Sequence, residues 1–180
     1  FELYANIDES KKLFLAIIKE GKNHDLSLCG AHAMDIMRME SGFLHWGHDI
    51  SPEENQYQAG LKFAISYKKN INFVGKEALL KIKDQNPTKS LAMMVLKDNR
   101  PGEPLLLHEE PIYLDDKIIG RTTSGNYSFN FKKNISFGYV NSGNTIENLV
   151  NKNLSIEVEK KKYPVTIIKK PLNQKNIKDI

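Results

Sequence analysis

Several features that define whole classes of protein are scarce in this sequence of 180 residues. A single cysteine, Cys29, excludes a disulfide framework and a multi-cysteine zinc site within the chain. No apolar run approaches the roughly 18 residues that a membrane-spanning helix needs. Only three of the 26 basic residues are arginines, whereas nucleic-acid-binding proteins more often gather arginine and aromatic side chains on one face. We therefore expect neither a membrane nor a nucleic acid as a partner.

The sequence also lacks a signal-peptide pattern and an initiator methionine, since it begins at Phe1. We expect a cytoplasmic protein, and a piece of something longer. Hydrophobic residues make up 40% and charged residues 27%, values that are typical of a soluble globular protein. The longest basic run, Lys160-Lys161-Lys162, is interpreted as a solvated turn and a strand edge protected by lysine.

The first half of the sequence predicts a mixture of helix and strand. Apolar residues at helical spacing predict helices from Asp8 or Ser10 to Lys19, between Gly30 and Gly42, and over 76–83. The run Ser51-Pro52-Glu53-Glu54 is typical of a helix start. The alternation of Leu61, Phe63 and Ile65 predicts a strand.

The second half predicts strands almost throughout. They are expected over residues 91–96, 111–114, 117–120, 135–140, 154–158 and 165–169, with turns between them. Six strands in some 80 residues favour a small barrel or sandwich. Asn86-Pro87-Thr88 is the best internal boundary, because the period changes there from helical to strand-like. The fold class is therefore α+β.

Three patterns could carry chemistry of their own. His45 and His48 with Asp49, and with His32 upstream, could bind a metal ion, although the spacing is not that of a helical zinc site, and we favour an ordinary polar turn. Ser124 could be a nucleophile, but it lacks the flanking glycines of a nucleophile elbow, and a β-turn is the better interpretation. Cys29 is better interpreted as a small buried residue than as a reactive thiol. No metal site is predicted.

Glu2 is the remaining candidate, because it lies among large apolar residues in Phe1-Glu2-Leu3-Tyr4. In a short strand, such an acid can be a surface alternation. If it is enclosed, its carboxylate needs paired donors, and the N–H and NH₂ groups of a pterin edge would supply them. The pattern favours the surface alternation, but the sequence alone does not decide between the two interpretations.

The order of motifs resembles the glycine cleavage T-protein (aminomethyltransferase) family. The resemblance rests on Phe1-Glu2-Leu3-Tyr4, the run from Gly30 to Gly42, Trp46-Gly47-His48-Asp49, Ala59-Gly60-Leu61 and residues 73–79. In the second half it rests on residues 119–125 and Gly138-Tyr139-Val140. Trp46 replaces a tyrosine and Met34 an arginine of the T-protein proper, and this region with residues 105–112 is more similar to the C-terminal parts of dimethylglycine and sarcosine dehydrogenases.

The resemblance implies three segments. Residues 1–86 would be the C-terminal part of a folate-binding aminomethyltransferase domain, 87–172 the family's C-terminal β-barrel or jelly-roll-like domain, and 173–180 a tail. Glu2 would bind the pterin of tetrahydrofolate, and Arg38 and Glu40 would be structural supports, through an ion pair or a helix cap. The family's catalytic aspartate would lie upstream of Phe1, so no catalytic residue is expected in this chain.

We therefore expect the C-terminal portion of an enzyme that moves a one-carbon unit from a methylated amine to tetrahydrofolate. The amine would be of the glycine, sarcosine or dimethylglycine type. The partners would be folate, the amine, and an upstream half or partner subunit, with FAD possible in an upstream domain. This chain alone would transfer nothing. The alternatives are a non-catalytic folate-binding or assembly module and, ranked last, a metal-dependent hydrolase using His45, His48 and Asp49.

Overall fold

The computed structural model describes residues 2–69, 71–97, 100–141 and 146–168. Phe1, the expected turn at Ser142-Gly143, Lys169 and the tail at 173–180 lie outside these ranges. The chain divides into two compact units, Phe1–Met34 and Asp35–Ile180. Within the described ranges, no helix has the length and apolar character required to cross a bilayer.

The first unit consists mainly of one helix. α1 spans Ile7–Gly21, and a 3-10 turn, η1, spans Lys22–His24. Asp8 and Glu9 in the first turn of α1 and Lys19 in its last turn suit the helix dipole. The expected helix is therefore confirmed. Residues 2–6 have no regular structure, so the short strand expected around Glu2 is wrong.

α2, which spans Ala31–Glu40, continues into the second unit. Ile36 and Met39 are buried on one face of this helix, in a cluster with Leu91, Met93 and Phe137. Apolar residues three apart thus provide the packing face that their spacing predicts. The helix expected between Gly30 and Gly42 is confirmed.

Residues 41–88 differ most from the expectations. α3 spans Lys76–Ile82 as predicted, but residues 51–54 form turns rather than a helix. The side chain of Asn55 accepts hydrogen bonds from the backbone N–H groups of Tyr57 and Gln58. Such local bonds compete with helix formation.

The strand expected over 61–65 is also wrong. Residues Lys62–Ala64 form a 3-10 turn, η2. Among the described residues no strand pairs with this segment, and Phe63 is exposed. The alternating apolar residues therefore do not form a strand, because no described strand lies beside them to pair with.

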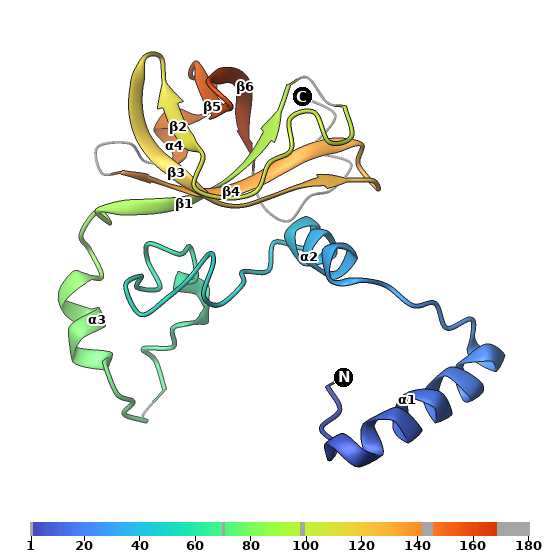
Figure 1. Ribbon diagram of the computed structural model, residues 1–180. Helices are drawn as coiled ribbons and strands as arrows, with labels where there is room; N and C mark the ends of the chain where they lie inside the picture. Colours follow the sequence, from blue (N-terminus) through green and yellow to red (C-terminus); the bar gives the residue numbers. More distant parts are fainter. Residues whose placement is uncertain (1, 70, 98–99, 142–145, 169–180) are drawn as a thin grey trace. The chain divides into compact units, whose positions relative to one another are not determined.

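The second unit contains a closed antiparallel barrel in the order β1-β4-β3-β2-β5-β6, with β6 returning to β1 (Figure 1). Its elements are β1 (Lys89–Leu96), β2 (Pro111–Leu114), β3 (Lys117–Ser128), β4 (Lys133–Asn141), α4 (Ile146–Leu149), β5 (Leu154–Val158) and β6 (Lys161–Ile168). Each of the six expected strands is present, and closure favours the barrel over the sandwich. The interpretation of Thr122 to Gly125 as a β-turn is wrong, because these residues belong to β3.

β1 is buried on both of its faces. Ala92, Met94 and Leu96 join the core inside the barrel, whereas Leu91, Met93 and Val95 join the cluster that includes residues of α2. Successive side chains of a strand point to opposite faces, so two cores require an uninterrupted apolar run. The run from Leu91 to Leu96 meets that requirement.

Candidate functional site

Glu2, the predicted pterin ligand, lies in the first unit and is exposed. Its carboxylate accepts a hydrogen bond of 2.6 Å from the Tyr4 hydroxyl. This bond, with a smaller effect of burial, raises the pKa of Tyr4 above its usual value. The Tyr4 hydroxyl bonds to Oε2 of this carboxylate and not to Oε1. Two parallel donors, such as a pterin edge presents, are a chemically suitable partner for such a group.

The second unit contains a partly buried polar network made by Arg38, Asp49, Thr123, Ser124 and Asp35, which we call the Arg38–Asp49 network. Asp49 is completely buried and forms an ion pair with Arg38. The Arg38 guanidinium also donates to Asp35, at 2.7 and 2.9 Å. A buried carboxylate is tolerated only when it is paired and hydrogen-bonded, and Asp49 fulfils both conditions.

Two consecutive hydroxyls of β3 complete this network. Thr123 Oγ1 donates to Asp49 at 2.6 Å, and Ser124 Oγ donates to Asp49 at 2.8 Å while accepting from Arg38 at 2.8 Å. The register of β3 against β4 shifts between Thr122 and Ser124, and such bulges re-aim side chains. Ser124 is therefore engaged at both its donor and an acceptor position, which does not suit a nucleophile.

Tyr139 of β4 fixes the backbone of the same turn. Its hydroxyl donates to the Asp49 carbonyl oxygen at 2.9 Å. Burial, together with the negative charges of Glu54 and Asp49, raises the pKa of Tyr139 well above its usual value. The phenol therefore stays protonated and remains a donor at ordinary pH.

Glu54 and Lys89 form an ion pair beside this turn. Burial alone would raise the pKa of Glu54, but hydrogen bonds from Lys89 and Ser51 and the charge of Lys89 together lower it. Lys89 Nζ also lies 4.8 Å from the centroid of the Tyr139 ring. The pair thus links the turn at 51–54 to the first strand of the barrel.

Glu40, at the end of α2, makes a second set of contacts with the barrel. Its carboxylate accepts from Ser128 Oγ at 2.5 Å and from Asn130 Nδ2 at 2.8 Å. Arg38 and Glu40 lie two residues apart, and each contacts a different part of the β3–β4 hairpin region. These contacts fasten α2 to the outside of the barrel.

The histidines do not share a site with the Asp49 carboxylate. The rings of His45 and His48 are 4.6 Å apart, and His108 lies 6.4 Å from His48, all three being exposed. In the described part of the chain, no group of three or more histidine, cysteine or acidic side chains is placed to hold a metal ion. Because the Asp49 carboxylate is enclosed by Arg38 and the hydroxyls, the arrangement gives the hydrolase alternative no support.

Cys29 and His32 both belong to the first unit. Cys29 is exposed, so its interpretation as a small buried residue is wrong. It follows Leu28 in a stretch without regular structure and precedes α2.

Sequence reasoning identified Asp49 and Ser124 only as separate candidates for other roles. They lie 75 positions apart, and nothing in their spacing predicts that they meet at Arg38. The backbone N–H of His45 donates a further bond to Asp49, so the whole Trp46-Gly47-His48-Asp49 turn is tied to the network. Its donors and acceptors satisfy one another, which suits a rigid support better than a reacting group.

Two family descriptions match the chain. Residues 1–69 match the GCVT N-terminal domain, and residues 89–173 match the glycine cleavage T-protein C-terminal barrel domain. The second range contains all six strands of the closed barrel.

Curated relatives include three kinds of enzyme. The chain is 39% identical over 127 residues to 4-methylaminobutanoate oxidase (formaldehyde-forming) of Paenarthrobacter nicotinovorans, covering 71% of this chain and 15% of that protein. It is 34% identical over 140 residues to aminomethyltransferase of Symbiobacterium thermophilum, covering 78% and 36%. It is 32% identical over 174 residues to mitochondrial dimethylglycine dehydrogenase of Homo sapiens, covering 96% and 19%. The chain thus spans less than half the length of each.

A solved structure has a similar fold. It is the glycine cleavage system aminomethyltransferase T from Bartonella henselae, with a TM-score of 0.76 and 19% sequence identity. The match covers 93% of this chain and 44% of that one. The two family matches, over residues 1–69 and 89–173, identify this chain as a member of the glycine cleavage T-protein family.

Proposed function

We propose that this chain is part of a tetrahydrofolate-dependent aminomethyl or methylene transferase that acts on a methylated amine of the glycine, sarcosine or dimethylglycine type. The single observation that carries the proposal is the match of both halves to the family, with relatives named aminomethyltransferase and dimethylglycine dehydrogenase. Tetrahydrofolate, when bound, supplies the nitrogen atoms that accept the one-carbon unit.

Glu2 is the folate-orienting residue in this proposal. Its exposed carboxylate fits the paired N–H and NH₂ donors of a pterin, and Tyr4 holds it through one hydrogen bond. An acid that accepts two such bonds fixes the rotation of the ring as well as its position. Orientation of a reactant lowers the barrier only when the reacting partner is held too.

The acid that assists carbon transfer comes, we propose, from a companion domain or subunit. Asp49 is unsuited to this role, because it is completely buried and engaged by Arg38, Thr123 and Ser124. Arg38 and Glu40 are structural supports in this scheme. A flavin domain that oxidises the amine would belong to the dehydrogenase-type version of the same protein.

The function of Glu2 can be tested by calorimetric titration of the natural full-length protein with 5-formyltetrahydrofolate. Glu2→Gln keeps the shape of the side chain and removes its charge, so we expect the affinity to fall roughly tenfold or more. Glu9→Gln is the matched control, because Glu9 is also an exposed acid of the first unit and pairs with the exposed Lys12. Equal affinities of the wild type and Glu2→Gln would refute the assignment.

A non-catalytic folate-binding or assembly module is the alternative, favoured by the mutual satisfaction of the groups in the Arg38–Asp49 network. A turnover assay with sarcosine, dimethylglycine and tetrahydrofolate distinguishes the two. Methylene-tetrahydrofolate formed by the full-length protein supports the enzyme, whereas folate binding without turnover supports the module. We expect no turnover from the 180-residue chain by itself.

A further inference from the structure

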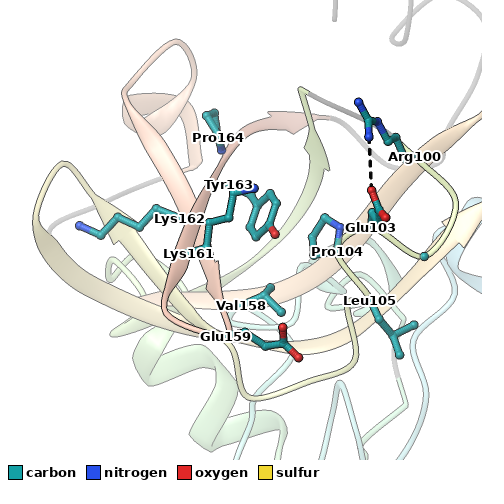
Figure 2. Close-up of a pocket in the computed structure, with 11 residues that line it drawn as sticks. Arg100, Glu103, Pro104, Leu105, Val158, Glu159, Lys161, Lys162, Tyr163 and Pro164 are labelled. Carbon is teal, nitrogen blue, oxygen red and sulfur yellow. Dashed lines mark ion pairs between the residues drawn. The ribbon is translucent and has the colours of Figure 1, made fainter.

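The barrel encloses its own apolar core. Where it is hollowed at one end, between residues 100–105 and 158–164, the groove carries side chains of both charges, and Arg100 pairs there with Glu103 (Figure 2). Among the described residues from β1 onward, the exposed large apolar side chains are Leu105, Leu107, Ile118, Phe129 and Val150. They are spread over several elements, so nothing in the described barrel calls for a partner to cover it.

The residues before β1 differ from the barrel in this respect. Large apolar side chains are exposed along most of this part of the chain, in both compact units. In the second unit they include Phe43, Trp46, Phe63, Ile71, Val74 and Leu80. Single exposed apolar residues are normal, but many of them in one part of a chain indicate a surface that another polypeptide covers.

Helix α1, in the first unit, shows this feature most clearly. One face of the helix carries apolar residues at helical spacing, which we call the α1 apolar stripe: Ile7, Phe14, Ile17 and Ile18. Ile7 is 87% exposed, Phe14 50% and Ile17 36%. The structure describes every residue of this helix, and only Gly21 is buried. The stripe therefore has the composition of a packing face without the burial of one.

The opposite face of α1 is suited to water. Glu9 and Lys12 pair there at 3.1 Å, both largely exposed, and the small Ala16 lies on the same side. A helix with one apolar and one charged face packs the apolar face on a core. A helix of 15 residues is marginal by itself in water, because most helix stability in proteins comes from such packing. Within the first unit, the described residues offer no core to the stripe.

The relatives indicate what covers the stripe. This chain spans less than half the length of each of them, and its second half matches the family's C-terminal domain. Most of their unmatched length therefore precedes the region that aligns with residue 1. Since α1 lies within the match to the GCVT N-terminal domain, that preceding part is the polypeptide nearest to it in the sequence of the relatives.

We propose that the α1 apolar stripe is the docking surface for the part of the family's N-terminal domain that precedes residue 1 in the relatives. The partner surface is an apolar groove that holds Phe14 and Ile17 near its centre and leaves the face with Glu9 and Lys12 in water. An amphipathic helix in an apolar groove is a recurring mode of recognition. The inference rests on the proposed function only in requiring that preceding part, and it needs neither folate nor Glu2.

Hydrogen exchange measured by mass spectrometry tests this proposal without any substitution. The amides of α1 are compared in the 180-residue chain and in the natural full-length protein. We expect exchange to be roughly tenfold or more slower in the full-length protein, because burial of even one large apolar side chain stabilises the helix by about that factor. Equal rates in the two proteins overturn the proposal. So does strong protection in the 180-residue chain, since the second unit or a second copy would then cover the stripe.

A variant and a matched control identify the face that docks. Phe14→Asp places a charge within the stripe, so α1 of the full-length protein should lose its protection, while the melting temperature of the 180-residue chain stays unchanged. Ala16→Asp introduces the same charge on the opposite face and should keep the protection of the wild type. An equal loss in both variants would reflect helix propensity alone and would overturn the assignment of the stripe.

The result can be separated from that of the folate titration. Protection of α1 in the full-length protein, with no effect of Glu2→Gln on folate affinity, would support the docking surface and refute the folate assignment. A clear effect of Glu2→Gln without protection of α1 would do the reverse.

Discussion

Arg38 connects two carboxylates and a hydroxyl that come from three separate parts of the second unit. It bonds to Asp35 on its own helix, to Asp49 in the turn at 46–49, and to Ser124 on β3. A planar guanidinium with five donors can serve such a set of partners, whereas the single ammonium of lysine cannot match its geometry. This explains why an otherwise lysine-rich chain has an arginine here.

Arg38→Met should destabilise the chain by about 3–5 kcal/mol, because it leaves the Asp49 carboxylate buried and without its counter-charge. Urea unfolding followed by circular dichroism measures the free energy of unfolding. Arg38→Lys should cost less, since it keeps the charge and loses only the fork of donors.

Arg121→Met is the control for that experiment. Arg121 pairs with Glu109 at 2.7 Å, but both side chains are largely exposed. Such surface pairs contribute about 0–1 kcal/mol. If Arg38→Met cost no more than Arg121→Met, the network would not be the support that its burial indicates.

At the scale of elements, β3 and β4 pair closely at two glycines, Gly120 and Gly138. A Cβ atom added to Gly120 would lie 1.8 Å from the Tyr139 carbonyl oxygen, and one added to Gly138 would lie 2.7 Å from the Arg121 carbonyl oxygen. These contacts are with backbone atoms, which cannot move aside as a flexible side chain can. The paired strands therefore require glycine at both positions.

Gly120→Ala should lower the free energy of unfolding by about 1–3 kcal/mol or more, because the methyl group forces β3 away from β4. The melting temperature and urea midpoint report the loss. Gly30→Ala is the matched control, since among the described residues no atom beyond its chain neighbours lies within 4 Å of its added Cβ, and its effect should stay within about 0.5 kcal/mol. Similar effects at the two glycines would show that the strands can separate without cost.

At the scale of the whole chain, the buried apolar residues lie unevenly. In the described ranges, both hydrophobic clusters consist of residues from Ile36 onward, and the chain's two compact units divide between Met34 and Asp35. α1 instead exposes several large apolar side chains, among them Ile7, Phe14 and Leu15. Independent stability is therefore expected of the second unit.

A shortened chain that begins at Gly30 should keep the main cooperative unfolding transition. It retains α2 and every residue of the two clusters, so its melting temperature should stay within about 4 °C of that of the 180-residue chain, a shift equivalent to roughly 1 kcal/mol. Far-ultraviolet circular dichroism during heating measures it. Loss of the cooperative transition would mean that residues 1–29 stabilise the barrel unit.

Local patterns predicted the strands and three helices because each signal is contained in a few adjacent residues. The apolar run at 91–96 and the spacing of Ile36 and Met39 are of this kind. The errors at 51–54, 61–65 and 122–125 have a different origin. In these segments a competing side-chain bond, a missing neighbour strand or a bulge decided the conformation. The division of the chain at residue 86 stays a prediction, as does the function of Glu2.

The amino-acid sequence by itself determined the α+β class, the six strands and the family resemblance, because periodicity and motif order are properties of the sequence alone. Only the tertiary structure decided that Asp49 and Ser124 meet at Arg38, that Glu40 contacts the β3–β4 hairpin, and that a charged groove lies at the end of the barrel. The reason is physical. These contacts join residues up to 90 positions apart, and packing of α2 and the turn after it against strands of the barrel, not any local preference, brings them together.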